Sequence, residues 1–181
     1  MSPTIHSLPI YGPDELFAAY GFQNRLAFGL PNRPARAYQL VQSFACHVAA
    51  SFLEVIEVRG LPEGDGIFVP SPCDTLNNLA DILTWRLKGR FVAAIDYPEP
   101  EAEGAFDFLA AELGRVKARL FEAFDLVQDL DAEAAMMGAY AEAHGRVRAW
   151  YDERRARRSG PPAGAVARFL RDEPALARPD V

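Results

Sequence analysis

Along the first hundred residues, the spacing of hydrophobic positions switches between the pattern of a strand and the pattern of a helix. This predicts strands and helices that follow one another along the chain. Ile67-Phe68-Val69 is a short run without a polar residue, and such a run is typical of a strand buried on both faces. Residues 91–95 predict the next strand. Between the two strands, apolar residues recur at helical spacing: Leu76, Leu79, Ala80, Leu83 and Leu87. Strand, helix and strand in this order form a βαβ unit, so we expect a parallel sheet.

Further elements are predicted before this unit. Residues 4–11 indicate an opening strand, residues 13–21 a helix, and residues 25–28 a second strand. A long helix is expected from about residue 35, with Phe44, Val48 and Phe52 in its apolar arc. The β-branched run of residues 53–58 indicates a strand, which we expect to flank residues 67–69.

The second half of the chain has helical periodicity throughout. One helix is predicted over residues 102–125 and another over residues 132–158, followed by a linker and a short helix at 163–171. The predicted organisation is an α/β cluster-binding domain at residues 1–100 and a helical region with a tail at 101–181. The expected fold class is therefore α/β: a parallel sheet flanked by helices, of flavodoxin-like or Rossmann-like type, with a helical C-terminal region.

Composition and charge argue against two kinds of binding partner, nucleic acid and membrane. The formal net charge of −6 argues against nucleic acid, which requires a basic footprint. No apolar run approaches the roughly 20 residues of a membrane span, and the N-terminus has no signal-peptide pattern. We therefore expect a cytoplasmic protein without a membrane partner. In that compartment the two cysteines are not expected to form a disulfide.

Cys73 is the residue whose position carries most information. It follows the buried strand at residues 67–69 and lies in the predicted first turn of a helix, with Ser71 as the expected N-cap and Pro72 as the first helical residue. Ligand sites of open α/β sheets form at this edge, and a helix N-terminus favours a thiolate. The alternative is a small apolar residue that fills the turn between strand and helix.

Cys46 alone would be interpreted as a packed helix cysteine at the border of a polar face, and His47 beside it as an exposed histidine. The sequence contains no Glu-x-x-His pair, no glycine-rich dinucleotide motif, no P-loop and no Gly-x-Ser-x-Gly elbow. The sequence therefore has no motif of these kinds that would indicate another chemistry.

Four ordered segments resemble the 2-hydroxyacyl-CoA dehydratase and benzoyl-CoA reductase family. Residues 9–21, PIYGPDELFAAYG, resemble its opening segment, and residues 42–46, QSFAC, resemble a cluster-ligand segment. Residues 66–79, GIFVPSPCDTLNNL, resemble a second such segment. Asp96-Tyr97-Pro98 with residues 108–113, FLAAEL, match a fourth. Two of these segments hold the only cysteines of the chain.

The resemblance implies a [4Fe-4S] cluster held by Cys46 and Cys73. It also implies a sister subunit, an ATP-hydrolysing activator that donates an electron at low potential, and an acyl-CoA substrate. In the dehydratases of the family a ketyl radical expels the 2-hydroxyl group; in benzoyl-CoA reductase the aromatic ring is reduced. The radical chemistry belongs to the cluster and the thioester.

The chain resembles only the N-terminal half of the family's subunits, which are about twice as long and carry a second α/β domain and a third cysteine. It is expected to be a fragment, one piece of a split subunit, or a short relative that no longer catalyses. The leading interpretation is a half-subunit of an iron–sulfur acyl-CoA enzyme. The alternative is a non-catalytic partner that stabilises a full-length homologue and has no cluster of its own.

Overall fold

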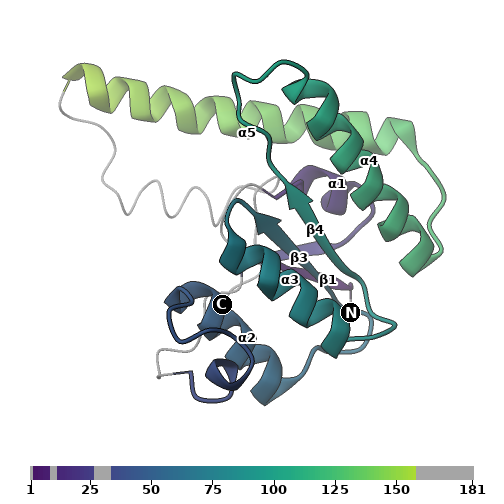
Figure 1. Cartoon of the computed structure of the whole chain (residues 1–181). Coiled ribbons are helices and arrows are strands. Elements are labelled where there is room, and N and C mark those ends of the chain that lie inside the picture. Colours follow the sequence, from purple (N-terminus) through teal and green to yellow (C-terminus); the bar gives the residue numbers. More distant parts are fainter. Residues whose placement is uncertain (1, 9–11, 27–33, 158–181) are drawn as a thin grey trace.

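A parallel sheet of four strands organises the chain. The computed structural model describes residues 2–8, 12–26 and 34–157, so the helix expected at 163–171 lies outside the described residues. The strands are β1 (Thr4–Ser7), β2 (Gln23–Leu26), β3 (Gly66–Ser71) and β4 (Val92–Asp96). They lie in the order β2-β1-β3-β4, and every neighbouring pair is parallel (Figure 1). The α/β prediction is confirmed.

The inner strand β3 separates two cores. Its six residues are all buried, and side chains alternate between the sheet faces along a strand. Ile67 and Val69 pack into one apolar cluster, while Phe68 packs into the other. The prediction of an inner strand at residues 67–69 is therefore confirmed. Its neighbours are β1 and β4, so the predicted flanking strand at residues 53–58 is wrong.

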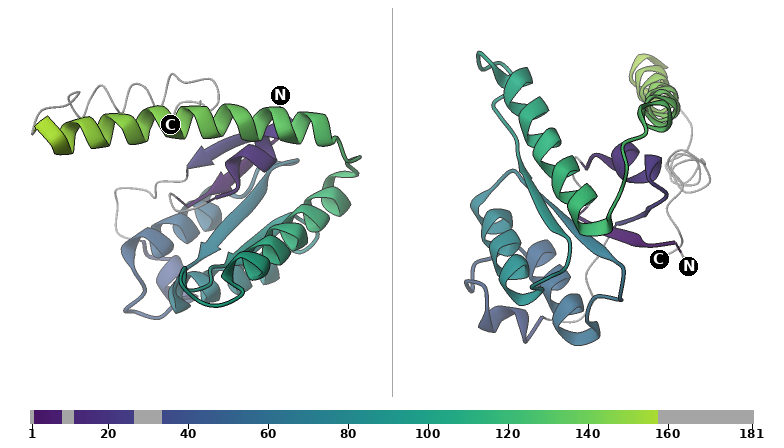
Figure 2. Two further views of the ribbon diagram at one scale, coloured as in Figure 1. Left: turned by 90° about the horizontal axis from the view of Figure 1, so that it is seen from above. Right: turned by 90° about the vertical axis from the view of Figure 1, so that its right-hand side faces the viewer.

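Helices cover both faces of the sheet (Figures 1 and 2). One face carries α2 (His47–Arg59) and α3 (Asp74–Arg86), whose buried residues share a core with Ile67 and Val69. The other face carries α1 (Asp14–Ala19) and α4 (Ala105–Phe124) around Phe68. Phe17 of α1 meets the Phe68 ring edge-on at 5.6 Å between centroids.

The segment before β3 differs most from expectation. Residues 53–58 belong to α2, and the expected long helix from residue 35 is instead a short 3₁₀ turn, η1 (Ala37–Gln39), followed by turns that lead to α2. The β-branched residues of the run favour a strand, but packing against the core favours a helix and has the larger effect. Phe52, Leu53 and Ile56 recur at helical spacing and face the core. Glu54 is also buried, and its carboxylate accepts the N–H of Ala37 at 2.8 Å.

α5 (Leu130–Arg157) lies outside these layers. Its Tyr140 and Ala143 pack near Ala18 of α1, and the helix extends well beyond α1 (Figure 2). Among the described residues, no helix combines the length and apolar character needed to span a membrane.

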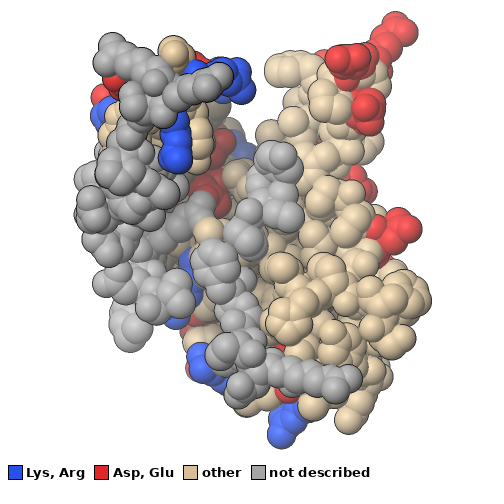
Figure 3. Space-filling model, turned by 90° about the vertical axis from the view of Figure 1, so that its left-hand side faces the viewer, with Lys and Arg blue, Asp and Glu red and all other residues tan. Residues whose placement is uncertain are grey.

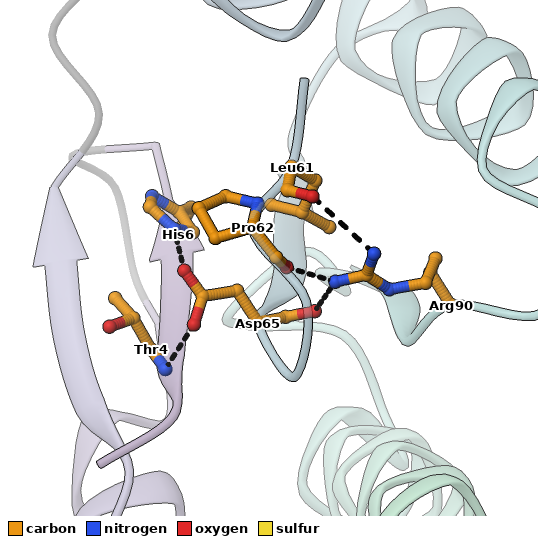
Figure 4. Close-up of polar contacts among 6 residues, drawn as sticks. All are labelled: Thr4, His6, Leu61, Pro62, Asp65 and Arg90. Carbon is orange, nitrogen blue, oxygen red and sulfur yellow. Dashed lines mark hydrogen bonds and ion pairs between the residues drawn. The ribbon is translucent and has the colours of Figure 1, made fainter. Parts of the chain in front are cut away.

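Polar contacts join the turn before β3 to the neighbouring strands at the amino edge of the sheet (Figure 4). The Asp65 carboxylate accepts the backbone N–H of Thr4 at 2.9 Å and contacts the His6 ring at 2.8 Å. The guanidinium of Arg90 donates to three backbone carbonyls: Leu61, Pro62 and Asp65. The turn from α2 to β3 is thereby joined to β1 and to the start of β4.

Candidate functional site: two thiols at the carboxyl edge of the sheet

Cys46 is the N-cap of α2, a different place from the middle of a long helix that the sequence suggested. Its backbone is extended, with φ −61° and ψ 147°, and its Sγ accepts the N–H of Ala49 at 3.5 Å. The residue is exposed, as is His47 beside it. Cys46 is therefore an accessible free thiol at a helix N-terminus rather than a packed helix residue.

Cys73 is the N-cap of α3. The sequence placed it two positions further into the helix, with Ser71 as N-cap and Pro72 as the first helical residue; both of these assignments are wrong. Ser71 is the last residue of β3, and the helix begins at Asp74. The prediction that Cys73 follows the buried strand at its carboxyl end is confirmed, and its thiol is free and exposed.

The two N-caps lie at the same end of a helix pair. α3 starts directly after β3, whereas α2 ends shortly before β3 begins, so both helices run from the carboxyl edge of the sheet toward its amino edge. Each helix has 13 residues. Their C-terminal ends are joined by two hydrogen bonds from Arg86 to Glu57, at 2.9 and 2.6 Å. Cys46 and Cys73 therefore both begin helices at the carboxyl edge, on one face of the sheet.

Ser71 contributes an unusual polar group close to Cys73 in the chain. The residue is 6% exposed, and its hydroxyl has no hydrogen-bond partner among the described residues. Alternation along β3 places Ser71 on the same face as Ile67 and Val69, the face covered by α2 and α3. A buried hydroxyl without a hydrogen-bond partner lowers the stability of the fold. Ser71 does not cap α3, so a ligand bound at this edge of the sheet would supply the missing partner.

The surface around Cys46 is uncharged and partly apolar. From Ala37 to Leu53 the sequence has no Lys, Arg, Asp or Glu. Phe44 is 82% exposed and Val48 is 47% exposed, although the sequence placed both in an apolar helix face. Figure 3 views the molecule from the left-hand side of Figure 1, and a broad uncharged area covers its lower right part, over the layer of α2 and α3. The charge-free run is the sequence signal that could have predicted this surface.

The donor set suits iron but supplies only half of what a cubane cluster needs. Exposed, free thiols are the donors that iron–sulfur clusters take, usually four per [4Fe-4S] cluster. The N–H groups at two helix N-termini also favour an anionic ligand. Within the described ranges, no group of three or more His, Cys, Asp or Glu side chains is placed to hold a metal ion. Two thiols thus fit part of the ligand set of such a cluster.

The fourth motif has a structural role at the carboxyl end of β4. Glu112 of α4 accepts the N–H of Asp96 at 3.1 Å, and Arg115 donates to the carbonyl of Ala94 at 3.0 Å. The hydrogen bond from Arg115 lowers the pKa of the Glu112 carboxyl below its usual value, although partial burial opposes this shift. The pair fixes α4 against the strand end.

A hollow of about 180 Å³ lies between α1, α4 and α5. Its apolar lining comes from Pro13, Leu16, Leu113 and Met137. The ion pair of Lys117 and Glu133, with an N···O distance of 2.6 Å, also borders it. α1 and α4 cover the opposite face of the sheet from α2 and α3, so this hollow is separate from the thiol pair.

The parallel sheet and the two exposed thiols define an α/β protein with free cysteines at the edge of the sheet where ligands of such folds generally bind. The family model described as 2-hydroxyglutaryl-CoA dehydratase, D-component, matches residues 9–170, and the chain belongs to this family. No curated protein matches the sequence.

Proposed function

We propose that this chain is a cluster-holding component of an iron–sulfur acyl-CoA enzyme, with Cys46 and Cys73 as ligands of a [4Fe-4S] cluster. The observation that carries the proposal is the pair of free, exposed thiols that cap parallel helices at one edge of the sheet. Family membership supports the same chemistry.

When bound, such a cluster supplies single electrons at low potential, for ketyl-radical dehydration of a 2-hydroxyacyl-CoA or for ring reduction as in benzoyl-CoA reductase. The residues of this chain bind and orient it. The N-terminal N–H groups of α2 and α3 favour its negative charge. The proposed partners are a sister subunit, an ATP-dependent activator and the acyl-CoA substrate. A cytoplasmic location would keep both thiols reduced.

Anaerobic purification tests the proposal. We expect a brown protein with charge-transfer absorbance in the visible range and with equal amounts of iron and acid-labile sulfide. Reconstitution with iron and sulfide under anaerobic conditions should restore these properties to protein that has lost them. A colourless protein that takes up no iron under either condition would contradict the proposal.

A second candidate function is a non-catalytic partner that stabilises a full-length homologue. It is favoured by one observation: the described residues provide no group of three ligands for a metal ion. This candidate predicts a colourless, air-stable protein that co-purifies with a larger homologue, so the same purification distinguishes the two.

A further inference from the structure

We propose that the Ser71 hydroxyl donates a hydrogen bond to a sulfur of the cluster held at Cys73, and that this hydrogen bond makes the cluster easier to reduce. The inference rests on the proposed function. It gives a role to a residue outside the ligand set.

Ser71 is the one residue of β3 with a polar side chain. The five residues before it in the strand, Gly66 to Pro70, are apolar. Ser71 is 6% exposed, and its hydroxyl has no hydrogen-bond partner among the described residues. Buried hydroxyls in folded proteins generally have a partner, so this one indicates a group that binds at the carboxyl edge.

Two ordinary partners do not use this hydroxyl. Cys73, and not Ser71, is the N-cap of α3, so the hydroxyl does not satisfy the start of that helix. Asp96 of β4 stands opposite Ser71 in the parallel register. Its side chain is exposed, yet its carboxylate does not accept the Ser71 hydroxyl. The hydroxyl proton is therefore available to another acceptor.

Ser71 lies on the same side of the sheet as the thiols. Alternation along β3 directs its side chain to the face covered by α2 and α3, the two helices that Cys46 and Cys73 cap. The Cys46 sulfur accepts the N–H of Ala49, whereas the Cys73 side chain makes no capping hydrogen bond. Rotation of Ser71 about one bond, between staggered positions, turns its hydroxyl toward a sulfur beside Cys73.

A hydrogen bond at this place changes the electronics of a cluster. Hydrogen bonds to the sulfurs are among the features that set the reduction potential of iron–sulfur clusters. The reduced cluster carries one more negative charge than the oxidised cluster, so a donor stabilises the reduced form more. Low-dielectric surroundings strengthen this effect for a buried donor. Removal of the Ser71 hydroxyl should therefore make the cluster harder to reduce.

The test is a redox titration of the full chain. Wild type, Ser71→Ala and Ser71→Thr are reconstituted anaerobically with iron and sulfide and titrated with titanium(III) citrate, with electron paramagnetic resonance following the reduced cluster. At a fixed potential, Ser71→Ala should lower the ratio of reduced to oxidised cluster about tenfold, which is about 59 mV for a one-electron couple. Ser71→Thr keeps the hydroxyl and should titrate like the wild type.

Ser51 provides a matched control. It is a second serine of the same layer, 3% exposed, and its hydroxyl also has no partner among the described residues. It lies within α2, five residues after Cys46, and not at the end of a strand. Ser51→Ala should leave the reduction potential unchanged, with circular dichroism confirming that each variant folds.

Release of iron to a chelator is a second measurement on the same proteins. Ser71→Ala should release iron about fivefold faster than the wild type, because the cluster has lost one hydrogen bond. Ser71→Thr and Ser51→Ala should release it at the wild-type rate. This measurement also covers a Ser71→Ala cluster that is too labile to titrate.

The outcomes separate this inference from the proposed function. A Ser71→Ala protein with wild-type iron content, potential and iron release would overturn the inference and leave the proposed cluster intact. Equal changes in Ser71→Ala and Ser51→Ala would also overturn it, because they would reflect the loss of any buried hydroxyl. A wild-type chain that binds no iron would overturn the proposed function, and the hydrogen bond with it.

Discussion

Ser71 ends β3 with a buried hydroxyl that has no partner among the described residues, and this predicts the effect of its removal. Without bound cluster, Ser71→Ala removes a desolvated polar group and should raise the free energy of unfolding by about 1 kcal/mol. Urea unfolding of the iron-free protein measures this change. A loss of stability of similar size would show that the hydroxyl is hydrogen-bonded and would contradict the prediction.

Cys46 and Cys73 have a capping role that serine can replace. Both are N-caps, and serine is among the preferred N-cap residues. Cys46→Ser and Cys73→Ser should therefore fold with an iron-free stability equal to the wild type or up to about 1 kcal/mol higher. Thermal unfolding followed by circular dichroism checks this. A large loss of stability in either variant would show that the thiol is a packing residue.

For individual residues, the sequence predicted the position of Cys73 after the buried strand, but it did not predict that the Ser71 hydroxyl is buried. A short apolar run followed by proline and an acid marks a strand end and a helix start, and these local signals were sufficient for Cys73. The helix begins two residues later than expected for a Ser71 cap, and sequence preferences place helix boundaries poorly. Burial of the Ser71 hydroxyl depends on α2 and α3 packing over it, which no local pattern encodes.

A buried hydrogen bond joins α2, the element that the sequence misassigned, to the preceding segment. Glu54 is 8% exposed and accepts the N–H of Ala37, which is itself fully buried. Glu54→Ala should lower the free energy of unfolding by about 2 kcal/mol, because it leaves that N–H without a partner. Glu54→Gln keeps an acceptor oxygen and should cost clearly less in the same urea titration. Equal losses for the two variants would contradict this role.

The misassignment of α2 has a physical cause. Residues 53–58 contain Val55, Ile56 and Val58, whose β-branching favours strands when considered alone. In the structure, packing against Ile67 and Val69 selects the helix, and tertiary contacts of this kind outweigh local propensity. The wholly apolar strand β3 was predictable because it is buried on both faces.

Contacts of Glu133 join α5 to α1 and α4. Partial burial alone would raise the pKa of its carboxyl, but hydrogen bonds from Lys117 and Tyr20 hold that pKa below the ordinary value of 4.5. The carboxylate therefore stabilises the folded chain fully above about pH 4.5 and loses this effect as the pH falls through the lower folded-state pKa.

Glu133→Gln should reduce the free energy of unfolding by about 1 kcal/mol at pH 7. The difference from the wild type should shrink as the pH approaches 3, because the wild-type carboxyl is then being protonated. Urea titrations of both proteins at pH 7, 5 and 3 measure it. A difference that is independent of pH would show that Glu133 acts through packing and not through its charge.

At the scale of the whole molecule, we predict that the two thiols alone do not support turnover of an acyl-CoA. The isolated chain, supplied anaerobically with an activator, ATP and a panel of 2-hydroxyacyl-CoA esters and benzoyl-CoA, should show no turnover. Activity should require the sister subunit as well, since membership of the D-component family implies a partner subunit. An acyl-CoA pocket also generally needs walls on more than one side. Clear turnover by the chain alone would contradict this prediction.

Iron and sulfide analysis of matched variants shows whether Cys46 and Cys73 hold an iron–sulfur cluster. Wild type, Cys46→Ser, Cys73→Ser and His47→Ala are reconstituted anaerobically side by side. His47 is exposed next to Cys46, which makes it the neighbouring control. We expect iron and sulfide in equal amounts in the wild type and His47→Ala, and loss of most of both in each cysteine variant. Cysteine variants that retain the wild-type content would contradict it.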